Sequence, residues 1–261
     1  MLCCGSREST SNQAHRGYAL NPLIIALDVD SSPGALKLVE QIGAGADFYK
    51  VGMELYAAAG MEIVSELNAQ GKKVFLDLKL YDIGETVKRA TRQICKSDAV
   101  TYLTIHGSGA IMKAAVEGRG NSETKLLAVT VLTSFDQEDL ADLGYPVQLA
   151  DLVELRVRKA VESGIDGVVC SPLEVARVRS LGGPNLKLVV PGVRSAGAAT
   201  GDQKRVATPS QAIADGADHL VIGRQVTRAA DPRAACEEIL AEIMVPETSS
   251  VSRDANWASR N

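Results

Sequence analysis

A lysine and two aspartates lie close together at the end of one apolar run, in a pattern that can carry charge-based chemistry. Residues 73–79 read Lys-Val-Phe-Leu-Asp-Leu-Lys, and Asp82 follows in the next loop. Side chains of an extended strand alternate between two faces, so Asp77 and Lys79 share one face while Val and Leu side chains share the other. Lys50 lies near the end of an earlier apolar run and can approach Asp77. The pattern predicts an alternating array of ammonium and carboxylate groups.

Such an array has two interpretations. Charges removed from water are costly unless they are paired, so the groups could form an ion-pair network that only fixes the strand register. They could instead form an active site, because coupled charges gather where chemistry is done. A lone Asp-x-Lys pair favours the first interpretation, whereas four coupled charges favour the second. Asp28, at the end of the first apolar run, is expected either to hydrogen-bond a sugar hydroxyl or to cap the next helix.

Short runs rich in Val, Ile and Leu alternate with segments of helical period, which is typical of βα units around a parallel sheet. The runs lie at 23–28, 47–52, 73–79, 99–106, 125–132, 166–170, 186–191 and 219–223. Helices are expected at 33–42, 56–70, 85–96, 147–163 and 209–216. Eight repeats predict an α/β fold with a single (β/α)8 TIM barrel, whose active site lies where the strands end. An open doubly wound sheet is the alternative, but no glycine-rich dinucleotide turn follows Asp28.

The last two runs are followed by residues suited to an anion. Arg194 follows the seventh run, and the eighth ends in Gly223 and Arg224. Barrels often bind phosphate at this place, where backbone N–H groups and a guanidinium fork can donate hydrogen bonds. A surface arginine is the alternative interpretation of the Gly-Arg pair. Residues 194–208, which include Gln203, are longer than a typical connection and are expected to form a lid over phosphate, with a tolerated insertion as the alternative.

The composition favours a single catalytic domain in the cytoplasm. The chain has 261 residues and a formal net charge of −4, which gives no general basic field for nucleic acid or an anionic membrane. Its five cysteines lack metal-ligand spacing and are expected to be reduced. Segments 1–20 and 246–261 are expected to be flexible arms on a barrel at 21–245. Neither a secretory signal nor a transmembrane segment is expected, and acylation of the Cys3-Cys4 pair is the weaker alternative.

These residues, in this order, resemble the orotidine 5'-monophosphate decarboxylase family over residues 21–245. The resemblance is carried by Ala26-Leu27-Asp28, Lys50-Val51-Gly52, Asp77-Leu78-Lys79-Leu80-Tyr81-Asp82-Ile83, Leu132-Thr133-Ser134, Pro191-Gly192-Val193-Arg194 and Ile222-Gly223-Arg224. Its most specific element is Asp-x-Lys-x-x-Asp, which a related family of phosphosugar decarboxylases shares. The other motifs distinguish the two families.

The resemblance implies a homodimeric enzyme that converts orotidine 5'-monophosphate to uridine 5'-monophosphate and CO2. This reaction is the last step of de novo pyrimidine nucleotide synthesis, and the family uses neither a cofactor nor a metal ion. By the same resemblance Lys79 is the proton donor, Asp77 and Lys50 complete its network, and Asp82 reaches into the partner subunit's site. The substrate is a small nucleotide, and no nucleic acid or membrane partner is expected.

The resemblance also assigns residues along the substrate. It implies that Asp28 and Lys50 contact the ribose and that Ile83 and Thr86 belong to the loop shared between subunits. It places Thr133 and Ser134 by the pyrimidine. The residues implied at the phosphate are Arg194, Gln203, Gly223 and Arg224. The chain departs from the family pattern at several positions. Tyr81 and Gly84 stand where His and Pro are usual, Gln225 replaces a Pro, and Ala110 ends a His-Gly-Ser-Gly stretch. Gly84 frees a backbone that a proline would fix.

Two other functions remain as alternatives. The first is a metal-dependent phosphosugar decarboxylase or aldolase-like enzyme of the same barrel group, in which an acidic residue replaces Lys50 to help hold magnesium. The second is a non-catalytic barrel that binds a phosphate ligand, because the fold alone does not decide function. Nucleophilic catalysis with histidine has little support, since His15, His106 and His219 have no evident partner in the sequence.

Overall fold

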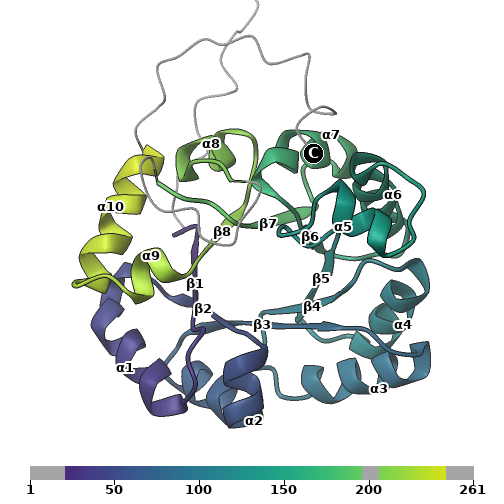
Figure 1. Ribbon diagram of the computed structural model, residues 1–261. Coiled ribbons are helices and arrows are strands. Elements are labelled where there is room, and N and C mark those ends of the chain that lie inside the picture. The colour runs from purple at the N-terminus through teal and green to yellow at the C-terminus, as the bar shows by residue number, and fades with distance from the viewer. Residues whose placement is uncertain (1–20, 196–205, 245–261) are drawn as a thin grey trace, which may run out of the picture.

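The computed structural model describes residues 21–195 and 206–244, which form a closed barrel of eight parallel strands (Figure 1). Each strand pairs with the next, and β1 pairs with β8 to close the barrel. The strands are β1 (Leu23–Ala26), β2 (Phe48–Val51), β3 (Lys73–Leu80), β4 (Tyr102–His106), β5 (Lys125–Val129), β6 (Gly167–Val169), β7 (Lys187–Pro191) and β8 (His219–Ile222). The predicted TIM barrel is confirmed, and the open doubly wound sheet is wrong.

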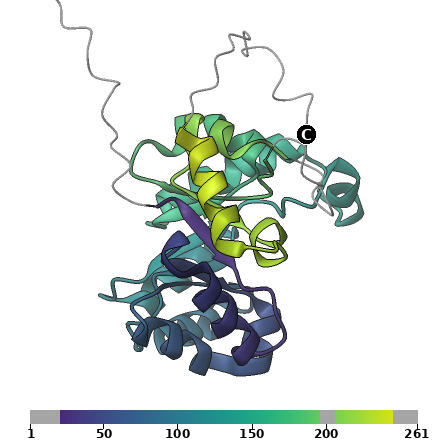
Figure 2. The same cartoon turned by 90° about the vertical axis from the view of Figure 1, so that its left-hand side faces the viewer.

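Helices surround the barrel, and the last of them lies beside the first (Figures 1 and 2). The helices are α1 (Ser32–Ile42), α2 (Met53–Ala69), α3 (Gly84–Cys95), α4 (Gly109–Arg119), α5 (Gln137–Asp142), α6 (Leu149–Glu162), α7 (Val175–Gly182), α8 (Pro209–Ala214), α9 (Arg224–Thr227) and α10 (Pro232–Met244). Two short 3-10 helices, Gly43–Gly45 and Pro172–Glu174, complete the described elements. The five expected helices are all present, with ends shifted by up to three residues.

Some expectations fall on residues that are not described. The expected arms at 1–20 and 246–261 lie outside the described residues, as do Gln203 and most of the expected lid. In the part of the chain that is described, no helix is both long and apolar enough to cross a membrane.

Alternation along the strands divides the core into two layers. Side chains on one face fill the inside of the barrel, and those on the other face pack against the helices. In β3 the expected alternation is confirmed, because Phe75 belongs to the inner cluster while Val74 and Leu76 belong to the outer one. The inner cluster consists of Ile24, Ala26, Phe48, Phe75, Tyr102, Leu127, Val129, Val169, Val189 and Val221.

The carboxyl end of β3 departs from regular pairing. Leu76 pairs with Leu103 of β4, but the next paired residue, Leu80, lies opposite Ile105. Four positions along β3 therefore match two along β4, which is a β-bulge. Within it Lys79 has a φ of 49°, a left-handed conformation that is uncommon for a residue with a side chain. Leu78 packs against the outer cluster and the Lys79 ammonium lies beside Asp77, so these side chains keep the faces expected from sequence through the bulge.

Close packing of α3 against α4 requires a residue without a side chain at one position. A Cβ on Gly118 would lie 2.3 Å from the carbonyl oxygen of Lys88 in α3. A backbone atom cannot move aside as the end of a flexible side chain can. Gly118 therefore sets how closely these two neighbouring helices approach.

We expect Gly118→Ala to lower the free energy of unfolding by about 1–3 kcal/mol, because α3 and α4 must separate to admit the methyl group. Gly109→Ala, in the first turn of the same helix, is the matched control. Its Cβ would meet only the Lys159 side chain at 3.8 Å, so stability should stay the same or rise. Urea unfolding of both variants measures the difference, and equal stabilities would contradict the close-packing argument.

Candidate active site

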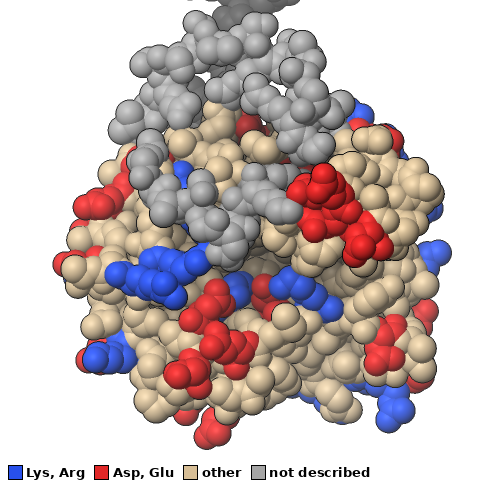
Figure 3. All heavy atoms as spheres, viewed as in Figure 1, with Lys and Arg blue, Asp and Glu red and all other residues tan. Residues whose placement is uncertain are grey.

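Three strand ends bring opposite charges together at the mouth of the barrel. The Lys79 Nζ lies 2.9 Å from Asp77 Oδ1, and the Lys50 Nζ lies 3.8 Å from Asp77 Oδ2. Lys50 also donates a hydrogen bond to Asp28 Oδ1 at 2.8 Å. The four groups form a continuous series in which carboxylate and ammonium alternate, from Asp28 to Lys79. Figure 3 shows positive and negative side chains side by side around a depression in this face.

The members of this series differ in their access to water. The side chains of Lys50 and Asp77 are only 11% and 14% exposed, whereas that of Lys79 is 33% exposed and that of Asp28 is 59% exposed. Coulomb interactions strengthen where water is displaced, so Asp77 holds both lysines firmly. Lys79 keeps enough open surface to meet a ligand, and Lys50 acts mainly on its two carboxylate partners.

Thr104 is part of this site, although the sequence did not indicate it. Its hydroxyl is fully buried, donates to Asp77 Oδ1 at 2.9 Å and accepts from the Lys79 backbone N–H at 2.9 Å. A single threonine in a strand is ordinarily taken as a β-forming residue. The only signal in the sequence is that Thr104 and His106 alternate on the inner face, next to the strand that carries Asp77.

The loop after β3 stands apart from the array within one chain. Asp82 is exposed and accepts a hydrogen bond from the Ile83 N–H at 2.6 Å. Ile83 is 73% exposed and Tyr81 is 66% exposed, and Thr86 at the start of α3 is exposed as well. The structure therefore separates Asp82, Ile83 and Thr86 from the groups at the strand ends and gathers them on the surface.

Tyr81 anchors this loop on the barrel. Its ring stacks on that of His106 with the centroids 4.0 Å apart and the planes at 25°. Burial, and secondarily the nearby Arg156 guanidinium, lower the pKa of His106 to about 4. A neutral imidazole is thus the stacking partner at neutral pH. The stack restrains the chain just before Gly84.

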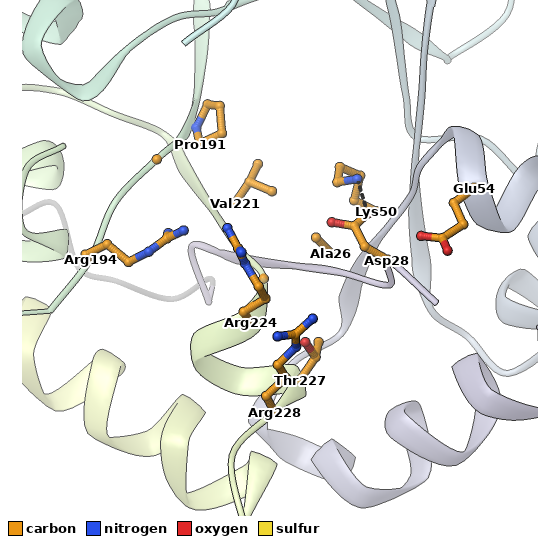
Figure 4. Close-up of a pocket in the computed structure, with 12 residues that line it drawn as sticks. Ala26, Asp28, Lys50, Glu54, Pro191, Arg194, Val221, Arg224, Thr227 and Arg228 are labelled. Carbon is orange, nitrogen blue, oxygen red and sulfur yellow. Dashed lines mark hydrogen bonds and ion pairs between the residues drawn. The ribbon is translucent and has the colours of Figure 1, made fainter. Parts of the chain in front are cut away.

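The anion end of the site borders a cavity of about 380 Å3. Asp28 and Lys50 line one side of the cavity, and arginines line the other (Figure 4). Arg194 and Arg224 were expected there, with Gly223 in the same lining. Arg228, one helical turn beyond Arg224, lines the cavity too and was missed because the sequence marked only the Gly-Arg pair.

Gln225 of α9 connects the segments that follow β7 and β8. Its side-chain amide donates to Ser195 Oγ at 2.7 Å, and its Oε1 accepts from the Ser195 N–H at 3.4 Å. Ser195 directly follows Arg194, and Gln225 directly follows Arg224. The pair therefore holds the two arginine-bearing segments at a fixed separation.

Thr133 and Ser134 lie in the connection between β5 and α5, outside the lining of this cavity. Within this connection the Phe135 N–H donates a hydrogen bond to the Leu132 carbonyl at 2.9 Å. Asp136 caps α5 by accepting from the N–H groups of Glu138 and Asp139. Among residues 21–195 and 206–244, no three His, Cys, Asp or Glu side chains are grouped so as to hold a metal ion.

The fold and the charged mouth define a (β/α)8-barrel protein in which arginines that follow strands β7 and β8 line a cavity. Within that class, the sequence model of the "Orotidine 5'-phosphate decarboxylase / HUMPS family" matches residues 21–239. The chain belongs to this family.

Relatives with the same name are similar over nearly their whole length. A protein of Rhodopseudomonas palustris (strain BisB5) named orotidine 5'-phosphate decarboxylase is 54% identical over 221 residues, which cover 85% of this chain and 94% of that protein. One from strain BisA53 is 52% identical, with coverage of 87% and 96%. The crystal structure of orotidine 5'-phosphate decarboxylase from Lactobacillus acidophilus superposes with a TM-score of 0.76 at 36% identity, covering 86% of this chain and 100% of that one.

The low pKa of His106 predicts an acid-sensitive fold. Its pKa falls from 6.5 in the unfolded chain to about 4 in the folded protein, so the folded state favours the neutral imidazole. This contribution to stability is complete above pH 6.5 and is lost as the pH falls from 6.5 towards 4. Between about pH 7 and pH 5, His106→Asn should lose about 1–2 kcal/mol less unfolding free energy than the wild type.

Urea unfolding of both proteins at the two pH values measures this difference. The pKa of His219 is also lowered by burial, and His219 stays in both proteins, so the comparison isolates His106. If both proteins lose the same free energy, His106 does not stay neutral in the fold.

Proposed function

We propose that this chain decarboxylates orotidine 5'-monophosphate to uridine 5'-monophosphate and CO2, the last step of de novo pyrimidine nucleotide synthesis. The observation that carries the proposal is the series Lys50–Asp77–Lys79 next to a cavity whose far side is lined by arginines. The relatives that are 50–54% identical to this chain carry the name of this activity. The array suits the reacting end of the nucleotide, and the arginines suit its phosphate.

Loss of CO2 leaves an electron pair at C6 of the pyrimidine, where the ring delocalises it poorly. Stabilisation must therefore come from a positive charge that is already in place. The Lys79 ammonium is held at 2.9 Å by Asp77 and supplies this charge beside C6. It then transfers a proton to C6, which completes the product. This interaction is stronger in the transition state than with bound substrate, so it accelerates the reaction.

Asp77 and Lys50 act on the same reacting centre from either side. Asp77 faces the carboxylate that leaves and orients the Lys79 ammonium through their ion pair. Lys50, placed between Asp77 and Asp28, forms an ion pair with each carboxylate and holds both in place. Asp28 is the most exposed of these groups and is suited to hydrogen-bond a ribose hydroxyl, with Lys50 as its second contact.

The phosphate is assigned to the arginine side of the cavity. Arg194 and Arg224 give guanidinium forks, and Gly223 lets the backbone approach phosphate oxygens closely. Gln203, outside the described residues, is assigned to the same end, and Thr133 and Ser134 to the pyrimidine. Binding energy gained at the phosphate is remote from C6, so it serves to hold the ring against the charged array.

The active form is proposed to be a homodimer in the cytoplasm, in which Asp82, Ile83 and Thr86 of each chain reach the partner subunit's site. What supports this is their exposure, together with that of two large side chains that also follow strand ends: Tyr81 after β3 is 66% exposed, and Met53 after β2 is 63% exposed. Large apolar side chains with this exposure favour burial against another surface. The net charge of −4 gives no reason to expect nucleic acid or an anionic membrane as the partner.

The first test follows loss of the orotate chromophore when purified protein meets orotidine 5'-monophosphate in buffer with a chelator. We expect turnover by wild type and a loss of at least about 1,000-fold in Lys79→Ala, because the charge at C6 and the proton donor disappear together. Lys73→Ala is the matched control, since this lysine begins the same strand and pairs with Asp47 at the surface. Its turnover should equal that of wild type.

No turnover by folded wild type would overturn the proposed reaction. Turnover of a phosphosugar that the chelator abolishes would favour the metal-dependent alternative of the same barrel group. The position of Lys50 argues against that alternative, because its ammonium would repel a divalent cation at Asp77.

The second test asks whether Asp82 acts across the dimer. Chains with Lys79→Ala and Asp82→Asn carry different tags, and the hybrid with one chain of each kind is purified. Each homodimer should be nearly inactive. The hybrid has one site with both defects and one with neither, so it should recover about half of wild-type activity.

The reciprocal hybrid is the control for this test. It combines a wild-type chain with a chain that carries both substitutions, so each of its sites should contain one defect and it should be inactive. An inactive first hybrid together with a half-active reciprocal hybrid would assign Asp82 to its own chain's site.

A further inference from the structure

The β-bulge in β3 creates a backbone group that the sheet does not satisfy. Between Leu76 and Leu80 the pairing with β4 is interrupted, and the Lys79 N–H lies within this interval. A buried N–H without an acceptor is costly, so it takes one from a side chain or water. Thr104 Oγ1 is that acceptor, at 2.9 Å from the Lys79 nitrogen.

The hydroxyl of Thr104 has a single possible orientation. The Lys79 N–H can only donate, so the Thr104 oxygen accepts there. The Asp77 carboxylate can only accept, so the Thr104 proton is directed to Asp77 Oδ1, at 2.9 Å. The same Oδ1 also receives the Lys79 ammonium at 2.9 Å. Backbone and side chain of Lys79 are thus joined in one ring through Thr104 and Asp77.

This ring coincides with an unusual backbone conformation. Lys79 has a φ of 49°, and such a conformation persists in a residue with a side chain only where its surroundings hold it. Thr104 is fully buried, so no water competes for its two hydrogen bonds. Thr124 and Thr130 are also buried, but the hydroxyl of each donates to a backbone carbonyl.

We propose that Thr104 is a positioning residue that fixes the direction of the Lys79 ammonium group. It does so by holding the Lys79 backbone in its left-handed conformation and the Asp77 carboxylate in one rotamer, without contacting the substrate. The proposal rests on the proposed function, because it concerns the group that delivers the proton. Removal of the hydroxyl leaves every phosphate and ribose contact in place but lets the ammonium leave its position beside C6.

The test compares Thr104→Val with Thr104→Ser and with Thr124→Val. Valine keeps the volume and removes the hydroxyl, and serine restores the hydroxyl. Thr124 lies just before β5 at the opposite end of the barrel, so its valine variant loses a buried hydroxyl far from the charged array. For each protein we measure kcat and KM with orotidine 5'-monophosphate, the Kd of uridine 5'-monophosphate, and thermal unfolding.

We expect Thr104→Val to lower kcat by about 10- to 100-fold, as small misplacements of a reacting group do, while KM and the product Kd stay within about twofold. Thr104→Ser should recover most of kcat. Thr124→Val should keep wild-type kcat even if its thermal stability falls as much as that of Thr104→Val. A folded Thr104→Val with wild-type kcat would overturn the proposal. So would equal kcat losses in Thr104→Val and Thr124→Val, which would mean a general loss of stability.

Failure of the proposed function gives a different result. In that case the wild type itself would not turn over the nucleotide, so there would be no wild-type kcat for the Thr104 variants to lower. Turnover by wild type with no effect of Thr104→Val rejects only the positioning role.

Discussion

The Asp77 carboxylate lies between two ammonium groups, and the rest of the site depends on this arrangement. A carboxylate that is 14% exposed is stable only with opposite charge beside it, and Lys50 and Lys79 supply that charge from both sides. Removal of either Lys50 or Lys79 would leave two carboxylates, Asp28 and Asp77, with a single ammonium group. The apolar layer beneath, which includes Phe75 and Tyr102, keeps water from entering below the array. Charge pairing and barrel packing therefore stabilise each other at the strand ends.

The strand pattern made most of the fold and part of the site predictable. Period-two alternation correctly predicted which face of β3 carries Phe75 and Asp77, because that rule depends only on local geometry. It could not predict the bulge at Lys79, because a register shift arises from the match between two strands that are remote in sequence. Thr104 was missed for the same reason: its role exists only once β4 lies beside the bulge. Arg228 was missed because it lies beside Arg224 only when the chain after β8 forms helix α9, which the sequence analysis did not predict.

Contacts between neighbouring βα units also explain how the chain is held near Gly84 and Gln225, two positions where it departs from the pattern of the family it resembles. At the two positions where the resemblance implies a proline, Gly84 and Gln225, side-chain contacts lie close by in this chain. The Tyr81 stack on His106 restrains the loop before Gly84, and the hydrogen bonds of Gln225 hold Ser195, shortly after β7. Such contacts cannot be read from one sequence, because each partner lies on a different βα unit.

The site divides its tasks between rigid strands and adaptable loops. Groups assigned to the reacting end of the nucleotide, Lys50, Asp77 and Lys79, all lie on strands, where hydrogen-bonded neighbours limit movement. Groups assigned to the phosphate and to the partner subunit follow the strands, either in a loop or, like Thr86 and Arg224, in the first turn of the next helix. Proton delivery demands a fixed ammonium, whereas capture and release of a nucleotide demand segments that can move. The strained backbone of Lys79 belongs to the first task, since a residue held in an uncommon conformation by a buried hydroxyl has fewer positions to occupy than one in a regular strand.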